Sequence, residues 1–350
     1  MERMGKFMVR INKGLLFGFL FTLLLTAAGC WRGQELNARA FVTAVAFDLP
    51  TEEGADPSEF LFSIQIPIPA KMGGEGGGSG DGGEKTFRVF GTTAKIVAIG
   101  IRQLQRQLDR ELFFGHTHLI LINAEVAKNI GVDRLLDYFK RDFRIQRRTR
   151  IAVIDGEARE ILNLQPPISQ TPDAYIENLL SPQSGSSINY ISDLGRFLVE
   201  QADEGIDPVL PRVSKGKETA LTGGGAVLKN GRFVGWLSNK ETRGLNIILS
   251  QNIISNYEVE CPFHPGEKIV VGADGFRTRY RLREEDNQTV FQIKVQGRFE
   301  TLEFTEKHGP LAEMQDKMEQ KVSAVVRTEL EGVVRRAQEL GADIIGVGLK

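Results

Sequence analysis

The sequence has very few of the residues from which catalytic and metal sites are usually built. Its 350 residues include two cysteines and four histidines. It also lacks a G-x-S-x-G elbow, an H-E-x-x-H pair and a phosphate-binding P-loop, which are the local patterns of common hydrolases, zinc proteases and nucleotide-binding proteins. We therefore expect no enzyme, and we assign no catalytic residue, cofactor or metal ligand.

The chain also lacks an excess of charge of either sign. There are 44 basic and 45 acidic residues, so nothing indicates the basic surface that nucleic-acid binding requires. Beyond the N-terminal region no apolar run approaches the length of a membrane-spanning helix. We expect no nucleic-acid partner, and we expect the chain behind its N-terminal segment to form an ectodomain.

The N-terminal region around which the chain is organised extends from Leu15 to Asp48. Four basic residues precede an apolar run of roughly 14 residues, which is shorter than the ~20 residues of a spanning helix. The run ends in Ala27, Ala28, Gly29 and Cys30. Basic residues, an apolar core and small residues in this order predict a secretory signal peptide over residues 1–29.

Cys30 indicates which kind of signal this is. A cysteine directly after small residues resembles a bacterial lipobox, in which the thiol receives a diacylglycerol and becomes the first residue of the mature chain, although Ala27 replaces the usual leucine. An ordinary signal with a stray cysteine and an uncleaved anchor are the alternatives. With Cys30 lipidated, only Cys261 would remain, and an exported chain without disulfides is typical of a bacterial envelope.

Length and hydrophobic pattern predict an α+β protein with several lobes. Residues 30–164 alternate strand and helix patterns and form an N-terminal α/β domain, with a glycine-rich insertion at 73–83 that we interpret as a linker. Residues 165–215 are a helical segment or small middle domain. Residues 216–350 form a C-terminal α+β domain, in which mixed sheets are flanked by helices.

Local patterns in the second half are stronger. Asn230-Gly231 between two apolar runs predicts a β-hairpin, and Ser238 is expected to cap the helix that follows. Three strand patterns come next, with a turn at Asp286-Asn287. A long amphipathic helix then opens at Pro310 and ends at Gly341, and we expect it to pack on a mainly antiparallel sheet.

The few histidines and the second cysteine offer one hypothetical metal site. His116 and His118 lie two residues apart on an expected strand, and Cys261 and His264 have a metal-like spacing. His308 is the fourth histidine. These residues come from segments that we assign to different domains, so we interpret them as a turn histidine and a buried thiol instead.

Several short segments together resemble the Ger(x)C lipoproteins, the C subunits of bacterial spore germinant receptors. No single segment is specific for this family, but the order of the segments along nearly the whole mature chain is specific. The segments are Cys30-Trp31, Glu35-Leu36, Val45-Ala46-Phe47-Asp48, Gly115-His116, Arg141-Asp142 with Arg147, Gly225-Ala226-Val227, Gly235-Trp236-Leu237, Glu241-Thr242-Arg243-Gly244-Leu245 and Ala342-Asp343-Ile344-Ile345-Gly346-Val347-Gly348.

The chain departs from the family pattern in several places. Arg32 stands where an acidic residue is common, Ala46 replaces a common glycine, and the run 73–83 resembles an extra insertion. The family usually continues past the last glycine pattern into a helix and a strand, whereas this chain stops at Lys350. We therefore expect the C-terminal domain to be truncated.

The resemblance implies a non-catalytic, lipid-anchored C subunit of a spore germinant receptor, in the outer leaflet of the spore inner membrane. It also implies integral-membrane A and B subunits as partners. Besides Cys30 as lipidation site, we name six residues as possible partner contacts: Trp31, Glu35, Leu36, Asp48, Glu241 and Arg243. For Glu241 and Arg243, a purely structural link between the hairpin and its following helix is an equal alternative.

Two other functions stay open from the residues alone. One is a generic envelope lipoprotein that binds a solute or peptidoglycan, and a saturable thermal stabilisation by amino acids or sugars would favour it. The other is a hydrolase whose site is assembled from distant segments.

Overall fold

The computed structural model of the chain describes residues 14, 17–18, 38–52, 54–69, 85–181, 187–251, 254–262, 264, 266–285, 288–304 and 315–349. The chain divides into two units, Met1–Arg39 and Ala40–Lys350. The elements below belong to the second unit, except that β1 begins at Arg39. The predicted signal peptide apart from residues 14 and 17–18, the glycine-rich insertion, the Asp286-Asn287 turn and the start of the last helix at Pro310 lie outside the described residues.

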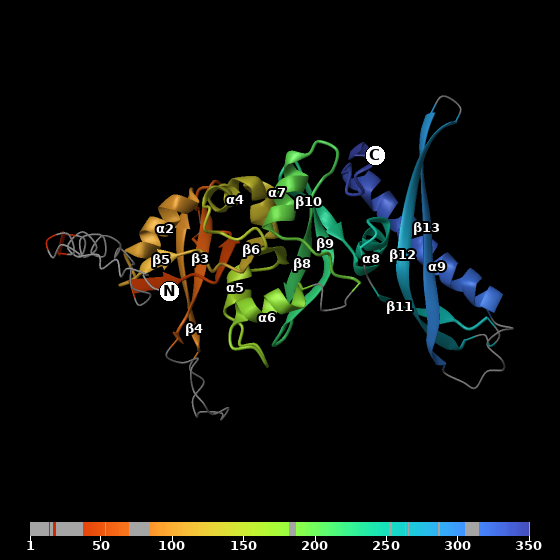
Figure 1. The fold of residues 1–350 in the computed structure, drawn as a ribbon, viewed down its shortest axis with the longest axis horizontal. Coiled ribbons are helices and arrows are strands. Elements are labelled where there is room, and N and C mark those ends of the chain that lie inside the picture. The colour runs from red at the N-terminus through yellow and green to blue at the C-terminus, as the bar shows by residue number, and fades with distance from the viewer. Residues whose placement is uncertain are drawn as a thin grey trace, which may run out of the picture. The chain divides into compact units, whose positions relative to one another are not determined.

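An eight-stranded sheet forms the centre of the second unit (Figure 1). Its strand order is β10-β9-β8-β7-β6-β2-β3-β4. Here the strands are β2 (Ala44–Asp48), β3 (Phe60–Pro67), β4 (Phe87–Ala94), β6 (Leu119–Asn123), β7 (Arg150–Asp155), β8 (Val209–Lys215), β9 (Ala220–Lys229) and β10 (Arg232–Leu237). A small second sheet pairs β1 (Arg39–Phe41) with β5 (Glu111–Phe113).

The central strands β2, β6, β7 and β8 are parallel, and they are apolar on both faces. Ile120 and Ile122 of β6 belong to one core, while Leu119 and Leu121 belong to the core on the opposite face. A parallel strand that is covered on both sides reads as a continuous apolar run. The run 119–122 therefore lies at the centre of the sheet.

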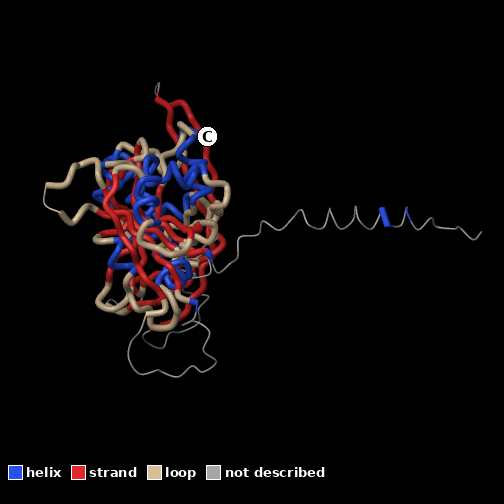
Figure 2. The backbone as a smooth tube through the Cα atoms, turned by 90° about the vertical axis from the view of Figure 1, so that its left-hand side faces the viewer, coloured by secondary structure: helices blue, strands red, loops and turns tan. Residues whose placement is uncertain are grey.

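Helices cover both faces of this sheet, and Figure 2 shows the helices in blue close to the strands in red. Apolar residues of α2 (Val97–Gln105), α3 (Ala124–Asn129), α4 (Val132–Arg141) and α7 (Leu194–Ala202) fill the first core. Residues of α5 (Ala158–Leu162) and α6 (Pro172–Leu179) fill the second core. The result is a three-layer arrangement with a mixed sheet in the middle.

The hairpin predicted around Asn230-Gly231 is present as β9 and β10. Both turn residues have positive φ, 52° for Asn230 and 71° for Gly231, as a two-residue hairpin turn requires. Helix α8 (Asn239–Ile248) follows immediately, and Ser238 is its N-cap. These local predictions are confirmed because each depends on residues adjacent in sequence.

A three-stranded antiparallel sheet, in the order β11-β12-β13, completes the fold. Its strands are β11 (Ser255–Glu260), β12 (Lys268–Glu285) and β13 (Gln288–Phe304). Helix α9 (Gln315–Leu340) packs Met318, Val322 and Val326 against this sheet, and Gly341 with φ of 60° follows its last residue. The α+β class, with a long C-terminal helix on a mainly antiparallel sheet, is confirmed.

The segment 165–215, expected to be a helical segment or small middle domain, contains α6 and α7 and ends in β8, which is paired with β7 and β9. Strand pairing across the sheet therefore extends into this segment.

The sheet also runs through the positions at which we divided the chain. The parallel neighbours β7 and β8 lie on opposite sides of residue 164, and β9 begins beyond residue 215. The domain limits that we gave at residues 164 and 215 stay predictions. Among the described residues, no helix combines the length and the apolar character needed to cross a bilayer.

Candidate functional site

Four of the predicted site residues lie outside the described part of the chain. They are Cys30, Trp31, Glu35 and Leu36. Lipidation of Cys30 and partner contacts of the other three stay predictions. The remaining predicted residues, Asp48, Glu241 and Arg243, are described, and the structure gives each of them a contact within the chain.

Asp48 ends β2 and is buried, with 3% of its surface exposed. Its carboxylate accepts hydrogen bonds from the backbone N–H groups of Ala158 at 2.6 Å and Arg159 at 2.8 Å, which open α5. Burial raises the pKa of Asp48 to about 6, although the two backbone donors act in the opposite direction. This carboxylate caps a helix inside the chain, and a partner contact of Asp48 stays a prediction.

Glu241 fixes the start of α8. The backbone N–H of Ser238 donates to Oε2 of Glu241 at 2.7 Å, and the N–H of Glu241 donates to Oγ of Ser238 at 3.3 Å. This reciprocal pair is a capping box. Glu241 thus has the structural role of joining the end of the hairpin to its following helix, and a partner contact of Glu241 stays a prediction.

Arg243 joins α8 to α9 instead of joining α8 to the hairpin. Its guanidinium donates two hydrogen bonds to the carboxylate of Glu329, one of them at 2.8 Å from Nε. It also donates to the carbonyl of Asn256 at 3.2 Å and lies 4.3 Å from the centre of the Tyr257 ring. The Glu329 side chain is 4% exposed, so this is a buried, bidentate ion pair.

Sequence reasoning missed Glu329, although a signal for it was present. The buried residues of α9 follow helical spacing from Val322 through Val326 to Val333. Glu329 lies three residues after Val326 and four before Val333, on the same face of the helix. An acidic residue inside an apolar stripe indicates a buried ionic partner, but the sequence cannot say which cation provides it.

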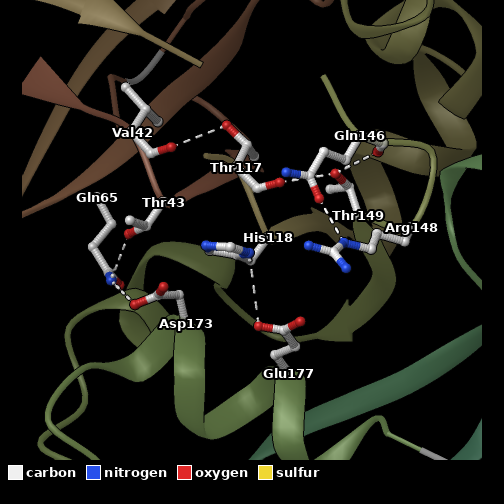
Figure 3. A network of polar contacts seen from close by, with 10 residues as sticks. All are labelled: Val42, Thr43, Gln65, Thr117, His118, Gln146, Arg148, Thr149, Asp173 and Glu177. Carbon is white, nitrogen blue, oxygen red and sulfur yellow. Dashed lines mark hydrogen bonds and ion pairs between the residues drawn. The ribbon is translucent and has the colours of Figure 1, made fainter. Parts of the chain in front are cut away.

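A polar network holds the N-terminal ends of the parallel strands together (Figure 3). Thr117 donates to the carbonyl of Val42 at 3.1 Å, and Thr149 donates to the carbonyls of Thr117 at 2.8 Å and Gln146 at 2.7 Å. Thr117 and Thr149 are buried. The chain that enters the sheet before β2 is thereby fixed to the starts of β6 and β7.

A second branch of this network reaches helix α6 (Figure 3). The amide nitrogen of Gln65 donates to Oγ1 of Thr43 at 3.3 Å and to the carboxylate of Asp173. Nδ1 of His118 lies 3.9 Å from Oε2 of Glu177, also on α6. Together the branches connect residues 42–43, which directly precede β2, to three strands and one helix.

An aromatic cluster lies beside this network. The ring of Phe41 meets those of Phe113 and His116 edge to face, with centroids 5.7 Å and 5.0 Å apart. The guanidinium of Arg144 lies 5.7 Å from the Phe113 ring centre and is paired with Asp142 at 2.6 Å. The family-like segments at Gly115-His116 and Arg141-Asp142 therefore meet next to the first residues of the second unit.

The hypothetical metal ligands do not come together. His116 is in the aromatic cluster and His118 faces Glu177, whereas Cys261 lies 3.7 Å from Nδ1 of His264 near β11. His308 is not described. Within the described ranges, no group of three or more His, Cys, Asp or Glu side chains could hold a metal ion.

A hollow with a volume of about 920 Å³ lies between the start of α2 and α4. Two ion pairs lie at this hollow: Lys95 with Asp56 at 2.5 Å, and Arg141 with Asp137 at 2.8 Å. We assign no reaction to the hollow, because these groups form ion pairs rather than a nucleophile with a base.

Comparison with known proteins identifies relatives for both halves of the chain. The family model described as the spore germination protein N-terminal domain matches residues 32–215. The model described as spore germination B3/GerAC like, C-terminal, matches residues 223–350.

Individual relatives are similar to this chain over most of its length. The YfkR protein of Bacillus subtilis (strain 168) is 25% identical over 337 residues, which cover 93% of this chain and 84% of that protein. Spore germination protein B3 of the same strain is 21% identical, over 80% of this chain and 72% of that protein. The crystal structure of the GerBC protein has a similar fold, with a TM-score of 0.51 at 18% identity, over 87% of this chain and 85% of that chain.

Proposed function

Because this chain belongs to the Ger(x)C family of spore germination proteins, we propose that it is the lipid-anchored C subunit of a spore germinant receptor. In this role Cys30 carries a diacylglycerol in the outer leaflet of the spore inner membrane. The chain assembles with the integral-membrane A and B subunits and catalyses no reaction itself. Its contribution is to hold a folded surface next to these partners during nutrient-triggered germination.

The observation that carries this proposal is the extent of the family match. The two family models together account for residues 32–215 and 223–350, which is nearly all of the chain behind Cys30. The match begins two residues after the cysteine, at the point where the predicted signal peptide ends. This supports the division into a processed leader and a family-specific ectodomain.

The polar network and the position of Cys30 together limit how far the second unit can lie from the bilayer. The second unit begins at Ala40, ten residues after Cys30 in the sequence. Ten residues span at most about 36 Å when fully extended. Val42 and Thr43 are hydrogen-bonded to Thr117 and Gln65. A lipid on Cys30 would therefore keep Ala40, two residues before this network, within that distance of the bilayer.

The test replaces the proposed lipidation site. A Cys30→Ala variant that is still exported should lose incorporation of labelled lipid, membrane localisation and nutrient-triggered germination, because two acyl chains give stable anchoring and their absence leaves none. Fractionation of spores and a germination assay measure both effects. Full membrane localisation together with normal germination in this variant would contradict the proposal.

Cys261→Ala is the matched control. Cys261 is buried in the core of the three-stranded sheet, with 4% of its surface exposed. Its replacement should leave lipid labelling and localisation unchanged, because a buried thiol is not accessible to the modifying enzyme. Co-purification of the membrane subunits with the control, but not with the Cys30 variant, would further support assembly through the anchored state.

A further inference from the structure

One face of the β12–β13 hairpin carries five basic side chains. Arg277, Arg279, Arg281 and Arg283 alternate along β12, so they point to the same side of the strand. Lys294 of β13 is directly opposite Arg279 and shares that side. All five residues are exposed. We refer to these five residues as the basic ribbon.

The basic ribbon has almost no acidic compensation. Arg283 lies 4.0 Å from Glu285 near the end of the hairpin. Across the described parts of the chain, no ion pair is found for the other four members of the ribbon. Their cross-strand neighbours on β13 are Gln296, Lys294 and Gln292. Like charges directly opposite each other destabilise a strand pair. The positive charges of Arg279 and Lys294 therefore repel each other across the hairpin.

The opposite face of the hairpin determines the direction in which the ribbon points. Tyr280 and Ile293 pack against the core that contains α8, and Phe276 and Val295 pack against the core that contains α9. Thr278 donates to the carbonyl of Ile247 at 2.8 Å. With this face attached to the helices, the basic ribbon is held toward the outside of the protein.

We propose that the basic ribbon is a docking surface for the anionic phospholipids of a membrane. Four of its five cations are arginines, whose planar guanidinium groups bind phosphate oxygens in pairs. From Arg277 to Arg283 the strand extends about 20 Å, with one arginine every ~7 Å. Such a row presents an array of charges instead of a pocket, and it matches an array of phosphate groups.

The choice of a bilayer rests on the proposed function, because a lipid on Cys30 would keep the chain at a membrane surface. Clusters of four to eight Lys and Arg residues close to a membrane are attracted by anionic lipids. The ribbon adds a second contact to the anchor, and this contact would restrict how the ectodomain is oriented on the membrane.

The experiment measures the distance between the ribbon and the bilayer in the full, lipidated chain. A donor dye is attached at Gln292→Cys, which lies opposite Arg281 on the same face, and an acceptor is placed on lipid headgroups. We expect energy transfer to be about twofold or more higher in phosphatidylcholine vesicles that contain phosphatidylglycerol than in phosphatidylcholine alone. The increase should disappear in 1 M salt, where the Debye length is about 3 Å.

Charge variants test whether the basic ribbon, rather than the net charge of the chain, causes the increase in energy transfer. The double variant Arg279→Glu with Arg281→Glu should lose the increase, while Arg279→Lys with Arg281→Lys should keep most of it. Arg102→Glu with Arg106→Glu changes the total charge equally, at exposed residues on and next to α2, and should keep the increase. Unchanged thermal melting of all variants shows that they fold.

Four results would overturn the proposal. Energy transfer that does not depend on phosphatidylglycerol, or an equal loss in the α2 control, would exclude a specific lipid contact. A ribbon reversal that leaves the transfer unchanged, but abolishes co-purification of the membrane subunits from spores, would indicate an acidic protein partner instead. A chain that leaves the vesicles altogether contradicts the proposed anchoring as well as the ribbon contact, whereas an anchored chain with unresponsive transfer contradicts the ribbon contact alone.

Discussion

At the scale of single residues, charged side chains that we expected at a partner surface have contacts inside the chain. Asp48 caps α5 and Arg243 binds Glu329. Both belong to segments that resemble the Ger(x)C family. The resemblance alone gives no physical reason for the residue types at these two positions. Burial and hydrogen bonding provide a structural reason for both.

Asp48 should make stability depend on pH. Its pKa is 3.8 in the unfolded reference and about 6 in the folded chain, so the folded state binds the proton more tightly. Ionising the buried carboxyl therefore costs stability as pH rises from about 4 to about 6, by about 3 kcal/mol in total. Below pH 4 the cost vanishes, because the group is protonated in both states.

An Asp48→Asn variant removes this titration. Its free energy of unfolding relative to the wild-type chain should therefore increase by about 3 kcal/mol between pH 4 and pH 7. Urea unfolding at several pH values measures the difference. The lost backbone hydrogen bond adds a constant offset that does not change with pH. A difference that stays flat across this range would mean that Asp48 does not control the pH dependence.

At the scale of elements, α8 and α9 cross at Gly244. An added Cβ at Gly244 would lie 2.7 Å from the backbone oxygen of Glu329, in the facing turn of α9. Side-chain carbon atoms do not approach backbone atoms so closely, so the helices can only meet here without a side chain. The Arg243–Glu329 pair and the Gly244 contact thus occupy the same crossing.

The pair Gly244→Ala and Gly332→Ala tests this crossing. Gly244→Ala should lower the free energy of unfolding by about 1–3 kcal/mol, because the helices must move apart. Gly332 is on α9 with nothing within 4 Å of an added Cβ, so Gly332→Ala should raise stability by up to about 1 kcal/mol through the better helix propensity of alanine. Thermal and urea unfolding compare the two, and equal effects would contradict the close approach.

At the scale of the whole molecule, the eight-stranded sheet joins segments that family models treat as separate. The N-terminal model ends at residue 215, at the end of β8. In the structure β8 pairs with β9 along its length, and Leu210 packs in one core with Ala226 and Leu228. A sequence-based boundary at this position cuts through a sheet and through its core.

Two fragments test whether this continuity matters for folding. Residues 32–215 should not melt cooperatively, because β8 would have a free edge and an uncovered apolar face. Residues 32–237 contain all eight strands and should recover a cooperative transition. Circular dichroism melts compare them. A sharp transition at the same temperature in both fragments would show that the hairpin β9–β10 is not needed for the fold.

The sequence by itself determined the local elements and the family. The Asn230-Gly231 hairpin, the Ser238 cap and helix α9 depend on residues close in sequence, for which turn and helix rules suffice. The ordered family-like segments identified the Ger(x)C family because they extend along nearly the whole mature chain. The α+β class followed from the same periodic patterns.

Only the tertiary structure decided how distant segments use these elements. Sheet pairing made β8 a neighbour of β7 and drew the strands on either side of residues 164 and 215 into one sheet. The contact of α8 with α9 paired Arg243 with Glu329. The pairing of β12 with β13 brought Lys294 opposite Arg279. These contacts join residues far apart in the chain, and no local pattern specifies which partner a buried charge or a strand edge will meet.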